Sequence, residues 1–302
     1  MHVVVTGAAG YLGSELVPLL LQAGHSVRAL VRAEQKVSGI EPVHGALPDA
    51  TLCRRLCAGI DAVVHLANVA HVNADAGLLK TINLDATLEL ASAAKAQGVR
   101  KFIFLSSSKA RYPEHSAYAR YKAAAEIALR ELHESGRFDV ICLRAALIYG
   151  RGMKGNLRGL LRVLSRPTLP VFVGSDNSLG MISVGDASRA IIAALDTADM
   201  PDQVWELADG TQYTLNGLVQ QVRSVQGLPP PTVILPRHVF WCCAALVTAL
   251  SPLIKTSLSL STYNALFTET WRADSQFSLH TGFAAQDSFF SLLPALLEDV
   301  KQ

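Results

Sequence analysis

Apolar runs and helix-like stretches alternate along the first half of the chain. An apolar run over 3–6 leads into a glycine-rich turn, and the helical pattern that follows ends at Gly24. The same alternation recurs up to about residue 150, with runs that are apolar on both faces. Such strands, separated by helices, predict a parallel sheet covered on both sides. The expected strands are 3–6, 26–31, a weak one around Val43, 62–66, 101–106 and 140–143, and the expected helices are 15–23, 50–58, 77–97 and 117–135.

The rhythm changes after residue 150. Gly, Pro and Arg become frequent between residues 151 and 170, and short strand signals over 171–173, 181–184 and 204–207 mix with helical ones. We therefore expect an α/β fold with a doubly wound parallel sheet in residues 1–150. Residues 151–302 are expected to form mainly a smaller C-terminal substrate-binding lobe, with some elements returning to the sheet.

The most apolar stretch of this second lobe is 239–254, with the sequence VFWCCAALVTALSPLI. It is broken by Ser251-Pro252, and a bilayer span needs about 20 apolar residues. We interpret it as a buried helix of the second lobe. Contact with a membrane surface is the alternative that this stretch leaves open.

Charge and cysteine usage narrow the class of protein. The 27 Lys and Arg nearly balance the 25 Asp and Glu, so the net charge is +2 and nucleic-acid binding is not expected. The five cysteines are odd in number and match no zinc spacing, so we expect reduced thiols and no metal site. Together with an N-terminus that starts on a strand without a signal peptide, they favour a cytoplasmic protein.

A glycine-rich turn follows the first strand and carries the strongest binding signal. Residues 6–13 read TGAAGYLG, so glycines stand where a chain must turn sharply, approach a pyrophosphate and pack a helix against a strand. The amides at the start of the helix then face the phosphates. This pattern predicts a Rossmann-type dinucleotide-binding domain. Its expected cofactor contacts in the turn are Gly7, Ala9, Gly10, Tyr11, Leu12 and Gly13.

The end of the second strand bears on which dinucleotide is bound. NAD binders usually place an acidic residue there for the ribose 2′-hydroxyl. Here residues 27–32 contain no acid, and Arg32, together with Arg28, is suited to a 2′-phosphate. The sequence therefore favours NADP(H) over NAD(H), while a solvated surface charge remains the alternative for Arg32.

Three side chains are candidates for catalysis. Tyr118 and Lys122 stand at i and i+4 on one helix face, where an ammonium is expected to lower the pKa of the phenol for proton transfer during hydride transfer. Tyr121 points elsewhere on that helix. Serines 106–108 end a strand, and Ser108 is our choice for the hydroxyl that binds the substrate oxygen.

The chain resembles the extended short-chain dehydrogenase/reductases, the NAD-dependent epimerase/dehydratase family. The matching motifs are 6–13, 65–67, Asn83, 106–108, 118–122 and 144–150, in the family's order. Segments 69–72, 107–109 and 152–157 most resemble bacterial nucleotide-sugar 4-epimerases and 4-keto-reductases of surface-polysaccharide biosynthesis.

This resemblance implies an NAD(P)-dependent oxidoreductase or epimerase acting on a nucleotide sugar. It implies that Leu66 and Ala67 pass near the cofactor, that Asn83 supports the cofactor site and that Asn156 contacts the substrate pyrophosphate. His65 is expected to be a packed core residue. Relatives often pair through two helices, which here correspond to 77–97 and 117–135, so a homodimer is also expected.

Some residues depart from the family pattern. Lys109-Ala110 stands where dehydratases carry Asp-Glu, which argues against dehydration. Leu179 stands where relatives present an Arg to the substrate pyrophosphate, although Arg151, Arg158 or Arg162 offers a substitute. A reductase or alcohol dehydrogenase for an apolar, sterol-like or flavonoid-like substrate is therefore the alternative. A non-catalytic dinucleotide-binding regulatory protein is a further alternative.

Overall fold

The computed structural model describes residues 1–32, 39–70, 75–168, 171–173, 175–198, 200, 203–231, 233–235, 238–239, 241–242, 245–246, 271 and 275–301. The chain forms two compact units. The first comprises residues 1–146, 184–207 and 274–284, and the second comprises 147–183, 208–273 and 285–302.

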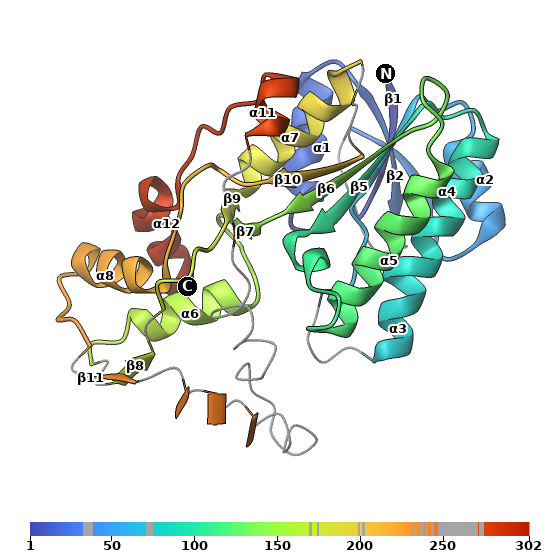
Figure 1. The fold of residues 1–302 in the computed structure, drawn as a ribbon. Helices are drawn as coiled ribbons and strands as arrows, with labels where there is room; N and C mark the ends of the chain where they lie inside the picture. Colours follow the sequence, from blue (N-terminus) through green and yellow to red (C-terminus); the bar gives the residue numbers. More distant parts are fainter. Residues whose placement is uncertain are drawn as a thin grey trace. The chain divides into compact units, whose positions relative to one another are not determined.

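The first unit is built on a seven-stranded sheet in the order β10-β6-β5-β4-β1-β2-β3 (Figure 1). Every pair of neighbours is parallel. The order reverses between β1 and β4, the kind of point at which open α/β sheets bind ligands, at the carboxyl ends of the strands. The strands are β1 (His2–Thr6), β2 (Ser26–Val31), β3 (Glu41–His44), β4 (Ala62–His65), β5 (Lys101–Ser107), β6 (Asp139–Ala145) and β10 (Val204–Leu207). The Rossmann-type fold expected from the sequence is thus confirmed.

Helices cover both faces of this sheet (Figure 1). One face carries α2 (Ala50–Cys57), α4 (Ala86–Ala96) and α5 (Ala117–Leu132), and the other carries α1 (Gly13–Gln22), α7 (Val184–Asp196) and α11 (Gln276–Thr281). Between α2, α4, α5 and the sheet lies a core of fully buried apolar side chains. Its members include Cys53, Leu90, Phe102, Leu129 and Phe138.

The helix expected over 77–97 is present, but it is not a regular α-helix throughout. The structure has a short α3 (Ala76–Lys80), a π-helical turn over Thr81–Asp85, and then α4. A π-helical turn carries one extra residue, and such turns are frequent at functional sites. Here the extra residue rotates the buried Asn83 toward the loop that follows β4.

In the part of the second unit that the structure describes, there are two small pairs of parallel strands and the helices α6, α8 and α12. Strand β7 (Leu147–Tyr149) pairs with β9 (Met181–Ser183), and β8 (Val171–Val173) pairs with β11 (Val233–Leu235). Helices α6 (Asn156–Leu164), α8 (Leu215–Val225) and α12 (Phe289–Lys301) contact one another. The buried Arg223 donates hydrogen bonds to the carbonyl oxygens of Leu164 and Arg166 and so fixes the end of α6. Within the described part of the chain, no helix is long and apolar enough to cross a membrane.

The buried helix expected over 239–254 lies mostly outside the described residues. Those that are described, 239, 241–242 and 245–246, are helical, and Val239, Trp241 and Leu246 are 36%, 48% and 62% exposed. The burial expected from the sequence is therefore not found in these three side chains.

Candidate active site

The glycine-rich turn lies at the carboxyl end of β1, against the chain that leaves β4. Gly7 has a φ of +72°, and a Cβ there would lie 2.9 Å from the backbone nitrogen of Ala67. A side chain at Gly13 would overlap the Gly7 carbonyl oxygen and lie 2.6 Å from the Cα of Ala8. Only glycine fits these two positions, so the first turn of α1 packs directly on the strand end. This cradle fits a dinucleotide, whose pyrophosphate the amides at the start of α1 would hold.

A series of hydrogen bonds holds the backbone that follows β4 in place. The Ala67 amide donates to the Thr6 hydroxyl at 3.2 Å, and that hydroxyl lies 2.7 Å from Nδ1 of His65. On the other side of the ring, Nε2 lies 3.0 Å from the Thr87 hydroxyl, which itself donates to the Asn83 carbonyl oxygen. Because the Thr87 hydroxyl donates its hydrogen to the Asn83 carbonyl oxygen, it can only accept from His65. His65 therefore donates from Nε2 and accepts at Nδ1, which is the neutral form of the imidazole.

Burial supports the same assignment for His65. Removal from water lowers the pKa of its imidazole to about 3, and the charge of Lys122 lowers it further. His65 also stacks on Phe104, with ring centroids 6.0 Å apart. The side chain is therefore a neutral core histidine, as the sequence suggested, and its role is to orient the backbone after β4.

Asn83 acts on the same segment through its side-chain amide. Its Oδ1 accepts from the Val69 amide at 2.9 Å, and its Nδ2 donates to the Val69 carbonyl oxygen at 2.8 Å. Both ends of the amide are thereby engaged with backbone. Asn83, expected among the cofactor-binding residues, is thus a positioning residue for the loop that carries Leu66 and Ala67.

Tyr118 and Lys122 lie on the first turns of α5, which begins after Ser116. The Ser116 hydroxyl caps the helix by accepting from the Ala119 amide at 3.1 Å. Lys122 is fully buried, donates to the Leu105 carbonyl oxygen at 2.7 Å and lies 4.3 Å from the centroid of the Phe104 ring. The helix cap and the strand β5 therefore fix both side chains at the carboxyl end of the sheet.

The serine that contacts Tyr118 is Ser107, whereas the sequence favoured Ser108. The side chain of Ser107 is hydrogen-bonded to the Tyr118 hydroxyl. Strand β5 extends through Ser107, while Ser108 already begins a short 3-10 turn over Ser108–Arg111. The strand end therefore directs Ser107, one residue earlier than expected, toward the phenol.

The protonation of Tyr118 and Lys122 follows from burial. Burial raises the pKa of Tyr118 to about 12, against the hydrogen bond from Ser107, which lowers it. Burial also lowers the pKa of Lys122 to about 7, although the charge of Glu126 opposes this shift. We expected the Lys122 ammonium to lower the pKa of the Tyr118 phenol, and this expectation was wrong. The ammonium is engaged with Leu105 and Phe104, and at Tyr118 the effect of burial outweighs that of the hydrogen bond from Ser107.

A buried ionic network lies next to the catalytic candidates and was missed in the sequence. Glu126, one turn after Lys122, accepts from the Ser106 hydroxyl and from Arg144, whose Nη2 lies 2.6 Å from its Oε2. Arg144 also contacts Glu206 at 3.4 Å, and Arg111 donates to that same carboxylate at 2.8 Å. The network joins α5 to strands β6 and β10. The spacing of Lys122 and Glu126 by four residues was the available signal, but their pairing partners come from distant strands.

The two arginines considered for the 2′-phosphate have different surroundings. Arg28 donates from Nη1 to the carbonyl oxygens of Leu56 and Ala58, and its Nε lies 3.0 Å from Oε1 of Glu41. It therefore caps the end of α2 and is not placed to assist Arg32, which is exposed just beyond the carboxyl end of β2.

In the second unit, Asn156 is the first residue of α6. Among the described residues, no group of His, Cys, Asp and Glu is arranged to hold a metal ion.

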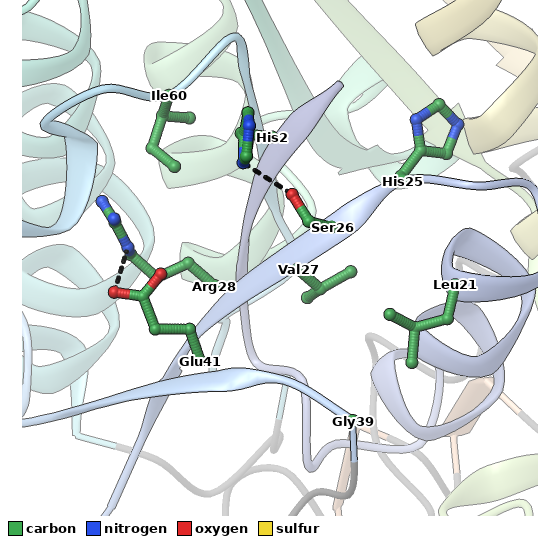
Figure 2. Close-up of a pocket in the computed structure, with 9 residues that line it drawn as sticks. All are labelled: His2, Leu21, His25, Ser26, Val27, Arg28, Gly39, Glu41 and Ile60. Carbon is green, nitrogen blue, oxygen red and sulfur yellow. Dashed lines mark hydrogen bonds and ion pairs between the residues drawn. The ribbon is translucent and has the colours of Figure 1, made fainter.

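A cavity of about 380 Å³ lies in the first unit, at the end of the strands opposite to the candidate active site (Figure 2). Figure 2 shows His2 turned toward Ser26, with Nδ1 and Oγ 2.6 Å apart, and Arg28 turned toward Glu41. His2 and Ser26 are the first residues of β1 and β2, so this cavity lies at the amino ends of the strands. Ligands of open parallel sheets bind at the carboxyl ends, and the cavity is therefore separate from the candidate active site.

The fold and the site together define the class of protein to which the chain belongs. A doubly wound parallel sheet, a glycine turn that leads into α1, and a Tyr–Lys pair beside a strand-end serine are the features of a dinucleotide-dependent enzyme of the oxidoreductase and epimerase type. The comparisons with known proteins identify the family. The family model "NAD dependent epimerase/dehydratase family" matches residues 3–213, and the chain belongs to this family.

Individual relatives differ in their named activities. A ceramide reductase of Caulobacter vibrioides is 33% identical over 262 residues, covering 84% of this chain and 80% of the relative. A UDP-glucose 4-epimerase of Vibrio cholerae is 28% identical over 264 residues, covering 80% of this chain and 79% of the relative. Among solved structures, MoeE5 in complex with UDP-glucuronic acid and NAD has a TM-score of 0.75 at 23% identity, covering 100% of this chain and 99% of that one. That structural likeness shows the fold.

Proposed function

We propose that the chain transfers hydride between a nicotinamide dinucleotide and a carbonyl or secondary alcohol, with Tyr118 as the proton donor and acceptor. The observation that supports it best is the hydrogen bond between Tyr118 and Ser107 beside the buried Lys122. A bound dinucleotide would supply the hydride. Tyr118 gives its proton to the carbonyl oxygen as the carbon is reduced, Ser107 hydrogen-bonds the same oxygen, and Lys122 orients the ribose and stabilises the phenolate.

We further propose that the substrate is a lipid-like ketone, which is the apolar alternative raised by the sequence. The relative named ceramide reductase supports this proposal. So does the second unit, where the position expected to hold a pyrophosphate-binding Arg is Leu179, fixed by backbone hydrogen bonds with Tyr213. Of the substitutes considered, Arg158 donates to the Asp299 carboxylate at 3.0 Å and to the Asp299 carbonyl oxygen. Its charge is therefore already neutralised.

A nucleotide sugar is the second candidate substrate. The Vibrio cholerae relative named UDP-glucose 4-epimerase supports it, as does the Gly155-Asn156 segment at the start of α6. In this case the same Tyr118 would remove a proton from the sugar 4-hydroxyl and return it after the 4-keto group has been reduced on the other face. Such an enzyme would belong to the synthesis of surface polysaccharides.

A direct comparison of substrates separates the two candidates. The purified chain is mixed with NADPH or NADH and a long-chain 3-keto-sphingoid or acylated keto lipid in detergent micelles, and oxidation of the dinucleotide is followed by absorbance. In parallel, UDP-glucose is incubated with the chain and NAD, and formation of UDP-galactose is followed by chromatography. Reduction of the lipid ketone alone supports the proposal, and interconversion of the UDP-sugars alone overturns it in favour of the second candidate.

We also propose that NADP(H) is preferred over NAD(H). The support is the exposed Arg32 at the end of a strand without acidic residues, although the solved complex mentioned above contains NAD. The Arg32→Ala variant is expected to bind NADPH about tenfold more weakly while its affinity for NADH is unchanged, because a phosphate ion pair is lost. Equal losses for both dinucleotides, measured by calorimetry, would rule out a 2′-phosphate contact.

A further inference from the structure

Lys122 and Glu126 are bound to consecutive residues of one strand. They lie one turn apart on the buried face of α5, where they are only 1% and 3% exposed. The Lys122 ammonium donates to the Leu105 carbonyl oxygen at 2.7 Å, and the Ser106 hydroxyl donates to the Glu126 carboxylate. Because Leu105 and Ser106 follow each other in β5, the cation and the anion are held over the same stretch of the sheet.

The Glu126 carboxylate is oriented by a bidentate ion pair. Arg144 donates from Nε to Oε1 of Glu126 at 3.0 Å and from Nη2 to Oε2 at 2.6 Å. Such pairs fix the geometry of a carboxylate more firmly than a single hydrogen bond does. In the parallel sheet, Arg144 is the register partner of Ser106 on β5 and of Glu206 on β10. A row of side chains across three adjacent strands therefore anchors Glu126.

The other titratable and charged groups around Lys122 and Glu126 come from α5, β4 and β6. They are Tyr118, His65, Cys142 and Arg144. Burial raises the pKa of the Tyr118 phenol and of the Cys142 thiol and lowers the pKa of the His65 imidazole, so these three groups are neutral at pH 7. Arg144 is bound to Glu126 and Glu206. Within the described part of the chain, Glu126 thus supplies the negative charge that acts on Lys122.

Burial makes the charge of Lys122 sensitive to this carboxylate. An ammonium that is removed from water tends to lose its proton, and burial lowers the pKa of Lys122 to about 7. The charge of Glu126 is the largest effect that opposes this loss. The Leu105 carbonyl oxygen and the Phe104 ring also contact the ammonium, but both are uncharged. At neutral pH, the protonation of Lys122 therefore depends on Glu126.

We propose that Glu126 is a positioning residue of the active site, whose anchored carboxylate keeps the Lys122 ammonium charged beside Tyr118. The charged ammonium stabilises the phenolate that forms when Tyr118 gives up its proton. The catalytic part of this inference rests on the proposed hydride transfer, whereas the effect of Glu126 on Lys122 does not depend on any substrate. It is the same for a lipid ketone and for a nucleotide sugar.

Titration of Lys122 tests the proposal in the full chain. The protein is labelled with 13C-lysine, the Lys122 signal is assigned by its loss in Lys122→Met, and the Cε chemical shift is followed against pH by NMR. In Glu126→Gln we expect the midpoint to fall by about one pH unit or more, because an opposite charge is removed from a buried site. Glu131→Gln, at an exposed position of the same helix, is the matched control and should titrate as wild type does. An unchanged midpoint in Glu126→Gln would overturn the proposal.

A double variant guards against a failure of Glu126→Gln to fold. The single change leaves the charge of Arg144 without its main partner, which is strongly destabilising for a buried pair. Glu126→Gln combined with Arg144→Gln removes both charges together. Lys122 should again titrate at a lower pH than in wild type, since Glu126 has the larger effect on it. A wild-type midpoint in the double variant would also overturn the proposal.

The pH dependence of turnover distinguishes a charge effect from a general defect. At saturating dinucleotide, kcat/KM for carbonyl reduction should decrease on the alkaline side as Lys122 loses its proton. In Glu126→Gln this decrease should begin about one pH unit lower, and Glu126→Asp, which retains the carboxylate, should restore it toward wild type. A rate reduced by the same factor at every pH would contradict the proposal. If wild type has no turnover but the Lys122 midpoint still falls in Glu126→Gln, the proposed function fails while the effect of Glu126 on Lys122 is supported.

Discussion

Neighbouring serines at the carboxyl end of β5 form hydrogen bonds with different partners. Ser107 contacts Tyr118, while the neighbouring Ser106 donates to the buried Glu126. Motif spacing identified the cluster of three serines and the Tyr–Lys pair. It did not distinguish Ser107 from Ser108, because the choice depends on where β5 ends and the 3-10 turn begins.

A matched pair of serine variants follows from this contact. Ser107→Ala should lower turnover by roughly tenfold to a hundredfold, because one hydrogen bond to the developing oxyanion is lost. Ser108→Ala should stay within about twofold of wild type, since Ser107 is the serine that contacts Tyr118. Steady-state rates with the same substrate decide between them, and a larger loss in Ser108→Ala would restore the original choice from the sequence.

The neutral state of His65 predicts how the free energy of unfolding changes at acidic pH. Its folded pKa of about 3 lies below the unfolded value of about 6.5, so the unfolded chain takes up the proton first as the pH falls. The free energy of unfolding should therefore decrease below pH 6.5, by about 2 kcal/mol at pH 5 from this residue alone. Urea denaturation of wild type and His65→Gln measures the difference. The variant should be less stable at pH 7 but lose less on acidification, and parallel pH profiles would contradict a neutral His65.

At the scale of elements, the sequence predicted the helices and strands of the first unit well. Alternating runs located β1, β2, β4, β5 and β6, because strands that are buried on both faces are apolar throughout. The π-helical turn over Thr81–Asp85 was not predictable, since it shares the composition of an ordinary helix and depends on the contacts of Asn83 with Val69. The Glu126–Arg144–Glu206 network was missed for a similar reason, because its members are brought together only by the folding of β6 and β10.

Asn83 offers a test of that π-helical turn. Asn83→Leu removes both hydrogen bonds to Val69 and leaves the backbone groups of a partly buried loop unpaired, at a cost of about 1–3 kcal/mol. The loss should appear as weaker dinucleotide binding by tenfold or more, together with a lower melting temperature. Asn216→Ala, which removes a bond to Asp176 in the second unit, is the control. Unchanged dinucleotide affinity in Asn83→Leu would show that the loop is held without it.

For the whole molecule, exposed apolar residues on α3 and α5 bear on the expected homodimer. Leu78 and Ile127 are 48% and 61% exposed, on the helices through which relatives were expected to pair. If the chain pairs through this face, Ile127→Glu should convert a dimer into a monomer at micromolar concentration, because a charge would be buried in the contact. Light scattering coupled to size exclusion measures the mass. A wild-type monomer, or a dimer that persists in Ile127→Glu, would contradict pairing through α5.

The proposed hydride transfer depends on Tyr118 acting as its acid and base. The most direct measurement is the rate of dinucleotide oxidation by Tyr118→Phe, with Tyr121→Phe as the control one residue from Lys122. We expect Tyr118→Phe to lose about a hundredfold or more of its turnover while dinucleotide affinity is retained, and Tyr121→Phe to remain close to wild type. Turnover of Tyr118→Phe near the wild-type rate would contradict the proposed mechanism.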